Sequence, residues 1–222
     1  MAAIANRGAG GLTPAVARRA RTRHTGAVDL IIAPLTGLAL TGALDDLARL
    51  RIAVFRDYPY LYDGTLAYEA KYLREFAQGK DGIIVAAKDG GRIVGCATGS
   101  ALATHHGPLQ QPFRERGYDI DSIFYCGESV LLPEYRGRGV GHAFFDEREA
   151  HARRRGYRLS TFCGVMRPDD HPLRPAGYTP LDAFWEKRGY RKAEGLTARF
   201  GWKDVGADAE TEKPMQFWIK AL

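Results

Sequence analysis

The sequence of 222 residues contains no long hydrophobic run. Its longest candidates, such as VDLIIAPL from Val28, fall far short of the roughly 18 apolar residues that a membrane-spanning helix requires. Cysteine is also scarce, because only Cys96, Cys126 and Cys163 are present, at spacings that fit neither a zinc site nor a disulfide framework. We therefore predict a cytoplasmic protein with reduced cysteines, no metal and no membrane partner.

Acidic residues are absent from the first 28 positions, which carry five arginines. Outside this segment 27 basic residues face 26 acidic ones, so the net charge of +6 belongs mainly to the N-terminal segment. A nearly neutral remainder gives little electrostatic basis for binding nucleic acid. We predict that residues 1–27 form a basic, disordered tail, either a transit peptide or a simple extension, and that residues 28–222 form one domain.

Hydrophobic periodicity predicts both strands and helices in that domain. Strand patterns occur at 28–33, 83–87, 92–99, 122–132, 157–165, 196–203 and 214–220. Helical patterns run from Thr41 to Pro59, from Asp63 to Ala77 and from Gly139 to Gly156, with Thr41 and Asp63 as N-caps, and a short helix begins at Thr179-Pro180.

The connections between these elements predict how the strands pair. An Asp89-Gly90 turn makes the second and third strands an antiparallel hairpin. One helix joins the strands at 122–132 and 157–165, so these two run parallel. The fold class is therefore α/β or α+β with a mixed sheet, and the aperiodic segments 104–121 and 166–178 are long loops of a kind that often carries function.

The segment YRGRGVG, Tyr135 to Gly141, lies between a strand end and a helix start. Its three glycines let successive backbone N–H groups approach a ligand, and the helix N-terminus adds unsatisfied donors and the positive end of its dipole. Such a loop predicts an anion site, most simply for phosphate. A dinucleotide-binding G-x-G-x-x-G would need glycine at His142, and the G-K-[ST] of a P-loop is absent.

This R-G-x-G-x-G loop, with Pro133 shortly before it, resembles the pyrophosphate-binding motif of the GNAT superfamily of acyl-CoA-dependent N-acyltransferases. The segment ESVLLPEYRGRGVG resembles that family's fourth strand and turn, and DAFWEKRGYRK resembles its late helix and the strand after it. The resemblance implies a mixed sheet of about six to seven strands with a splayed parallel pair. It also implies transfer of an acetyl group from acetyl-CoA to a small-molecule or protein amine, by a monomer or homodimer.

By this resemblance the phosphates of the cofactor lie on the glycine loop, and its pantetheine arm lies along the fourth strand. The residues implied are Val130, Leu131, Leu132, Arg136, Gly137, Arg138, Gly139, Val140, Gly141 and His142. The alternative for the two arginines is an ordinary solvated position, and for the glycines it is a tight turn alone.

Acylation of an amine requires a base, because an amine with a pKa near 10.4 is almost fully protonated at pH 7. Glu128 is the predicted base, since a carboxylate inside an apolar strand is costly unless it is used or paired. The alternative is a structural ion pair with an arginine. The tyrosine that many family members carry on the late helix is replaced here by Phe184-Trp185, so Tyr178 or His171 is the predicted acid.

The aromatic segment YPYLYDG lies where the family forms one wall of its acceptor site. We predict that Tyr60, Tyr62 and Asp63 contact the acceptor there, with Arg167 opposite, because aromatic faces and a carboxylate suit a cation. Ordinary packing at a helix end is the alternative. The acceptor amine and the acyl chain length stay open, and a catalytically silent acyl-CoA-binding module is the rival function.

Removing residues 1–26 should leave the stability of the domain unchanged, because this segment offers little apolar surface to offset the entropy of ordering it. By calorimetry, the melting temperature of the shortened protein should lie within about 2 °C of the full-length value. A larger drop would show that the segment docks on the domain.

Overall fold

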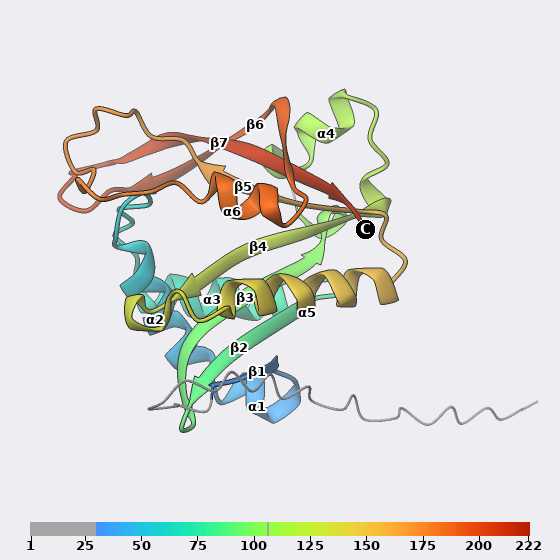
Figure 1. Cartoon of the computed structure of the whole chain (residues 1–222), viewed down its shortest axis with the longest axis horizontal. Helices are drawn as coiled ribbons and strands as arrows, with labels where there is room; N and C mark the ends of the chain where they lie inside the picture. Colours follow the sequence, from blue (N-terminus) through green and yellow to red (C-terminus); the bar gives the residue numbers. More distant parts are fainter. Residues whose placement is uncertain (1–29, 106) are drawn as a thin grey trace, which may run out of the picture.

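The computed structural model describes residues 30–105 and 107–222, through which a seven-stranded sheet runs (Figure 1). Its order is β1-β2-β3-β4-β5-β7-β6. The strands are β1 (Leu30–Pro34), β2 (Ile83–Asp89), β3 (Arg92–Ala101), β4 (Ile123–Leu131), β5 (Leu159–Val165), β6 (Arg191–Lys203) and β7 (Glu210–Ala221). β4 and β5 pair in parallel and the other neighbours pair antiparallel, which confirms the predicted mixed sheet. The predicted tail lies outside the described residues.

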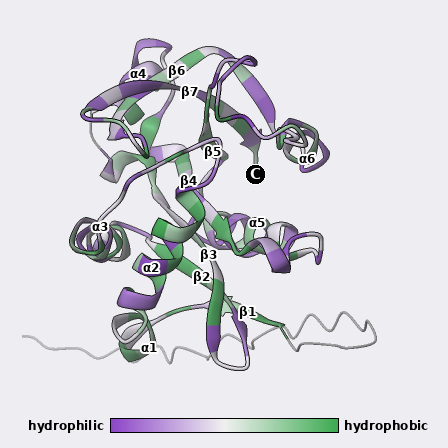
Figure 2. Cartoon of the chain, turned by 90° about the vertical axis from the view of Figure 1, so that its left-hand side faces the viewer, coloured by the Kyte–Doolittle hydropathy of each residue, from purple (hydrophilic) through white to green (hydrophobic). Residues whose placement is uncertain are grey.

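Helices cover both faces of this sheet. They are α1 (Gly37–Thr41), α2 (Leu44–Phe55), α3 (Leu66–Gln78), α4 (Gln111–Glu115), α5 (Val140–Arg154) and α6 (Asp182–Lys187). Figure 2 shows α2 and α3 on one face and α5 and α6 on the other, with hydrophobic residues on the strands between them. In the part of the chain described, no helix is both long and apolar enough to cross a membrane.

Three predicted helix starts are wrong by a few residues. Thr41 ends α1, where its hydroxyl donates to the Gly37 carbonyl at 3.3 Å, and α2 begins three residues later. Asp63 pairs with Lys203 instead of capping α3, whose first turn is held by the Thr65 hydroxyl. α6 begins at Asp182, two residues after the predicted Pro180, without a side-chain cap. In each case a competing contact or a short preceding turn decides where the helix begins.

Each face of the sheet has its own buried cluster. Leu47 and Leu50 of α2 and Leu73 of α3 pack on the β2–β4 face. On the opposite face Phe144 and Phe145 of α5 lie in a cluster with residues of β2, β3, β4, β5 and β7. Since α2 and α5 are both amphipathic, their apolar sides lock the two layers of helices to the sheet.

The pairing of β3 with β4 is interrupted where its register shifts between Ala97 and Gly99, at Thr98. Arg148 of α5, which is 1% exposed, fills this bulge. Its Nη1 donates to the carbonyls of Thr98 at 3.1 Å and Glu128 at 2.9 Å, and its Nη2 donates to the Ser129 hydroxyl at 2.8 Å. A buried arginine thus satisfies carbonyls that an uninterrupted ladder would have paired.

Replacing Arg148 by methionine should lower the free energy of unfolding by about 2–4 kcal/mol, because two buried carbonyls lose this donor. Urea unfolding measures the change. Arg153 lies on the same helix with a side chain that is 48% exposed, so Arg153→Met is the control and should cost less than about 1 kcal/mol. Equal losses in the two variants would contradict this role for Arg148.

Candidate active site

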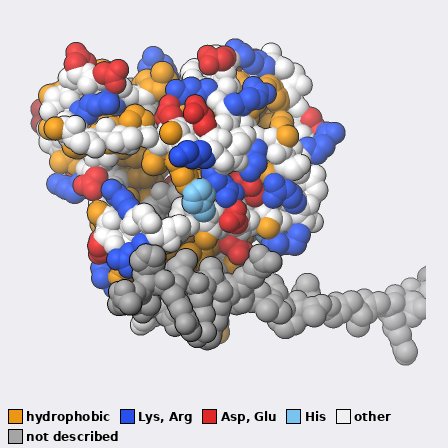
Figure 3. Space-filling model, viewed as in Figure 1, with side chains coloured by type: hydrophobic (Ala, Val, Ile, Leu, Met, Phe, Trp, Pro, Cys, Tyr) orange, Lys and Arg blue, Asp and Glu red, His pale blue; other side chains and the backbone are white. Residues whose placement is uncertain are grey.

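The candidate site is a cleft that opens where β4 and β5 separate. Their parallel pairing covers only Ile123, Phe124 and Tyr125 of β4, after which β4 follows β3 and β5 follows β7. A cleft of about 1240 Å³ occupies the resulting wedge, lined by the ends of both strands, the start of α5, α6 and the segment after α2. Figure 3 shows the surface hollowed on its left side, with apolar side chains inside the hollow. This is the splayed strand pair that the family resemblance implied.

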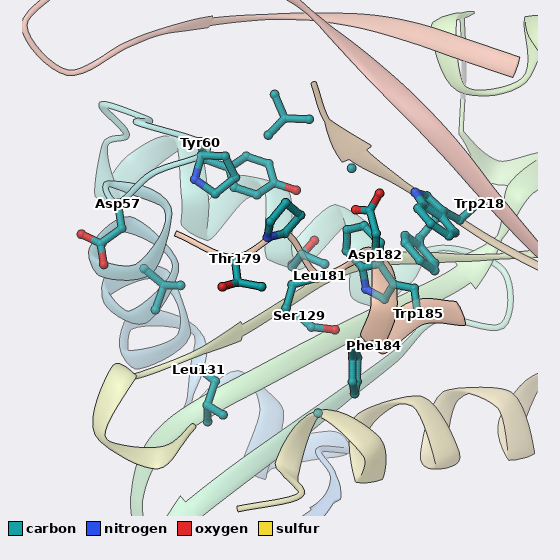
Figure 4. A pocket seen from close by; sticks show the side chains of 18 of the residues that line it. Asp57, Tyr60, Ser129, Leu131, Thr179, Leu181, Asp182, Phe184, Trp185 and Trp218 are labelled. Carbon is teal, nitrogen blue, oxygen red and sulfur yellow. The ribbon is translucent and has the colours of Figure 1, made fainter. Parts of the chain in front are cut away.

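Alternate residues of β4 turn their backbone groups toward β3 and toward the wedge. Just beyond the strand, the N–H of Leu132 donates to the Val94 carbonyl of β3 at 3.0 Å. By alternation Val130 faces β3 as well, whereas Ser129 and Leu131 turn their N–H and C=O groups toward the wedge, and these two residues line it (Figure 4). Of the predicted pantetheine contacts, the structure therefore brings Leu131 to the cleft and turns Val130 and Leu132 away from it.

The glycine loop forms one end of the cleft. Gly137 and Gly139 have φ angles of 74° and 79°, a left-handed conformation that favours glycine. A Cβ atom at either position would meet no other atom within 4 Å, so the space above the loop is open. The hydroxyl of Tyr135 donates to Asp89 at 2.7 Å and ties the loop to the β2–β3 turn. The first N–H groups of α5, which lack helical acceptors, are thus available to an anion.

Most of the residues predicted for the cofactor line this cleft. They are Leu131, Arg136, Gly137, Gly139, Val140, Gly141 and His142. Arg138 lies apart from them, because its guanidinium donates to the Glu134 carbonyl at 2.9 Å and covers the Tyr135 ring.

Glu128 lines the cleft from β4, and its side chain is 7% exposed. It forms an ion pair with Arg51 of α2, which also pairs with Glu69 of α3, and all three side chains are buried. The Tyr72 hydroxyl donates to the second carboxylate oxygen of Glu128 at 3.0 Å. Burial, supported by the charge of Glu128, raises the pKa of Tyr72 well above its ordinary value, so this hydroxyl keeps its proton. The predicted ion-pair alternative for Glu128 is therefore present in the structure.

The wall opposite the glycine loop comes from the segment between α2 and α3. Arg167, which follows β5, donates to the carbonyls of Pro59 and Tyr60, at 2.8 Å each. Its remaining donors meet the Asp204 carboxylate at 2.9 and 3.0 Å. Burial by itself would raise the pKa of Asp204, but hydrogen bonds from Arg167 and Lys213 outweigh it and hold that pKa below its ordinary value. Arg167 thus clamps the wall to the end of the β6–β7 hairpin.

Only some of the other residues predicted to contact the acceptor or to act as the acid line the cleft. Tyr60 and Tyr178 line the cleft, whereas Tyr62, Asp63 and His171 do not. The hydroxyl of Tyr62 faces Glu69. Burial raises the pKa of Tyr62 above its ordinary value, and the Glu69 carboxylate adds to this increase. A hydrogen bond from Lys203 lowers the pKa of Asp63. The structure thus commits these two side chains to neighbouring residues, and any contact with an acceptor stays a prediction.

A comparison with models of known protein families identifies the family of this chain. The model of the acetyltransferase (GNAT) family matches residues 47–190, which include Glu128, the glycine loop and α6. The chain belongs to this family. Its members are acyl-CoA-dependent transferases that bind an acyl-CoA and an amine acceptor. A search of curated proteins finds no match.

Solved structures of GNAT proteins share the fold at low sequence identity. The ribosomal-protein-alanine N-acetyltransferase from Brucella melitensis is 16% identical over 86% of this chain and 99% of its own, with a TM-score of 0.57. A GCN5-related N-acetyltransferase from Kribbella flavida is 17% identical over 87% and 98%, with a TM-score of 0.53. An aminoglycoside 6'-N-acetyltransferase complexed with coenzyme A is 17% identical over 86% and 96%, with a TM-score of 0.55.

In this GNAT domain two residues of α6 replace the tyrosine expected from the family. Phe184 packs against Phe145 and against His142 at the start of α5. Trp185 packs edge-on against Trp218 of β7 and presses on Gly164 of β5, where an added Cβ would lie 3.1 Å from its ring. Both side chains are half-buried and line the cleft, and neither carries a hydroxyl.

Sequence reasoning missed the partners of Glu128, although a signal for them exists. Arg51 follows directly on Leu50 in the apolar stripe of α2, and Glu69 lies in α3 beside Ala70. Arg148 lies four residues after Phe144 on the buried side of α5. A charged residue at an inward position of an amphipathic helix predicts a buried ion pair or network, since such a charge is costly without partners.

Proposed function

We propose that this protein transfers an acetyl group from acetyl-CoA to a primary amine, by direct attack of the amine on the thioester. The observation that carries the proposal is that one cleft combines a wedge between parallel strands with the open N-terminus of α5. The wedge offers unpaired backbone groups to an extended pantetheine arm, and the helix N-terminus suits a pyrophosphate. Among the described residues no three His, Cys, Asp or Glu side chains are grouped as metal ligands would be.

The backbone of β4 supports stabilisation of the oxyanion. The Ser129 N–H turns toward the wedge, and its peptide partner, the Glu128 carbonyl, accepts a hydrogen bond from Arg148 at 2.9 Å. A charge-assisted bond to the carbonyl polarises the peptide and strengthens its N–H as a donor. A thioester carbonyl beside Ser129 would therefore meet a preorganised donor as negative charge develops on its oxygen.

Glu128 is the proposed general base. It lines the cleft and is held in place by Arg51 and Tyr72, so its position is defined before an amine binds. It takes the amine proton directly or through one water. The Arg51 pairing and this role are compatible, because a carboxylate has two oxygens and several acceptor sites.

The protonation of Cys163 supports direct transfer over an acyl-enzyme that would form on this thiol. Cys126 and Cys163 line the wedge. Burial raises the pKa of Cys163 to about 12, so this thiol stays protonated at neutral pH. A thiol in that state is a poor nucleophile, and the attack on acetyl-CoA is left to the amine.

Turnover separates this enzyme from a silent acyl-CoA-binding module. Purified protein is incubated with acetyl-CoA and a panel of polyamines, amino acids, aminoglycosides and peptides with free N-termini, and released CoA is measured. Amine-dependent release supports the transferase. Tight binding of acetyl-CoA without release by any amine would favour the module.

Replacing Gly139 by valine should weaken acetyl-CoA binding at least about tenfold, because a β-branched residue is strained at this φ of 79° and its side chain enters the open space above the loop. Isothermal calorimetry measures the affinity. Gly156→Val is the matched control, since Gly156 has a φ of 83°, faces equally open space and lies beyond the far end of α5. Unchanged affinity in the Gly139 variant would remove the loop from the site.

Replacing Glu128 by glutamine should lower turnover about 10²- to 10⁴-fold and leave acetyl-CoA affinity nearly unchanged, because the variant keeps its shape but loses the proton acceptor. The rate of the variant should recover as the pH rises toward the pKa of the amine, which then deprotonates without help. Steady-state kinetics between pH 6 and 10 test both expectations.

Glu69→Gln is the matched control for this variant. It removes a carboxylate from the same arginine, but Glu69 is fully buried and does not line the cleft. Both variants should lose stability, and the Glu128 variant alone should lose most of its turnover per folded molecule. Equal turnover in the two would reduce Glu128 to a structural ion-pair partner.

A further inference from the structure

Acyl transfer from a thioester also needs a proton for the departing sulfur. The sulfur leaves as a basic thiolate, and at neutral pH the stable product is the protonated thiol. The two α6 residues that line the cleft, Phe184 and Trp185, supply no such proton. Tyr178 packs edge-on against Tyr58, with Arg174 over its ring, and His171 lies outside the cleft lining. The reaction therefore calls for a proton donor closer to the point where β4 and β5 separate.

Tyr60, between α2 and α3, is held by its backbone and by its ring. Its carbonyl accepts hydrogen bonds from Arg167 at 2.8 Å and from the Trp202 indole at 3.0 Å. Its ring lies 4.8 Å from that of Phe55 and 6.2 Å from that of Trp202. These contacts come from three separate parts of the chain, so the direction of the side chain is set by the folded structure.

The hydroxyl of Tyr60, by contrast, has no hydrogen-bond partner among the residues that the structure describes. Three other tyrosines do have one, since Tyr72 donates to Glu128, Tyr157 donates to Asp81 and Tyr190 meets Ser160. Figure 4 shows the Tyr60 hydroxyl pointing into the pocket, toward the side where Asp182 and Trp185 lie. A rigidly held phenol that leaves its donor unused inside a cleft is placed for a ligand.

The surroundings of the Tyr60 phenol come from both strands that border the wedge. Burial raises the pKa of Tyr60 above its ordinary value, and Cys163 and Glu128 act in the same direction. Tyr60 packs against the buried cluster that contains Cys163 of β5, and it lines the same cleft as Glu128 of β4. It stays protonated at neutral pH and is ready to donate.

We propose that Tyr60 is the catalytic residue that protonates the sulfur of CoA as it leaves, a role that rests on the proposed acetyltransferase function. A protonated amine first loses one proton through Glu128 to water. The neutral amine nitrogen then bonds to the thioester carbon, its second proton passes to Glu128, and the carbon–sulfur bond breaks with its electron pair on sulfur. The phenol proton moves to that sulfur, which gives CoA as the free thiol. The proton held on Glu128 then returns to the Tyr60 oxygen, directly or through water, so charges and protons balance.

The order of these steps has a physical basis. The negative charge of Glu128 disfavours ionisation of Tyr60 while the site waits for its substrates. Once Glu128 has taken the amine proton that charge is gone, and the phenol becomes a stronger acid at the moment when sulfur needs a proton. Base and acid are thereby coupled through the space between β4 and the acceptor wall.

The test uses the full-length protein with CoA itself as the probe, so it is independent of the unknown acceptor. The thiol of bound CoA is titrated by the ultraviolet absorbance of its thiolate, with the same variant without CoA as the reference. A phenol that donates to sulfur stabilises the thiolate, so Tyr60→Phe should raise the pKa of bound CoA by about one unit, a tenfold change in ionisation. With any amine that turns over, kcat should fall about 10²-fold or more while the KM for acetyl-CoA changes little.

Two comparison variants complete the test. Tyr68→Phe removes a hydroxyl from a side chain on α3 that is 59% exposed, and it should leave both the titration and turnover as in the wild type. Tyr178→Phe removes the hydroxyl of the tyrosine that the sequence predicted as the acid. A titration that shifts in the Tyr178 variant and not in the Tyr60 variant, or in neither, would overturn the proposal. Failure of the wild type to bind CoA would instead overturn the proposed function.

Discussion

The site depends on the separation of β4 from β5 after only three paired residues. The two strands separate because β4 continues to pair with β3 and β5 continues to pair with β7. At the register shift Gly127 and Glu128 of β4 lie opposite Thr98 alone, and buried Arg148 satisfies the carbonyls there. A cleft lined by unpaired backbone groups is stable only in such a frame, since those groups need either water or a ligand.

The charges around the cleft divide into those that hold the frame and those that are open to chemistry. Arg51 lies between Glu69 and Glu128, and this buried cluster has one more negative charge than positive. It connects α2, α3 and β4, so it contributes to the fold as well as orienting Glu128. Removing either carboxylate is costly in such a cluster, which is why stability and turnover have to be measured separately in its variants.

The acceptor wall is built from segments that lie far apart in the chain. Arg167 connects the carbonyls of Pro59 and Tyr60 to Asp204 at the end of the β6–β7 hairpin. The same clamp holds the phenol of Tyr60 toward the wedge (Figure 4). A substitution at Asp204, outside the cleft lining, would therefore reach the chemistry through the position of Tyr60.

The sequence by itself determined the alternation of strands and helices, the parallel pair around α5, the glycine loop and the place of Glu128 on β4, because these follow from local periodicity, turn residues and motif spacing. It did not determine the starts of α2, α3 and α6, where contacts such as Asp63 with Lys203 compete with capping. Only the tertiary structure paired Glu128 with Arg51, turned Arg167 into a clamp and left the Tyr60 hydroxyl without a partner among the described residues. These features depend on which distant side chains meet across the sheet, and no local pattern encodes that meeting.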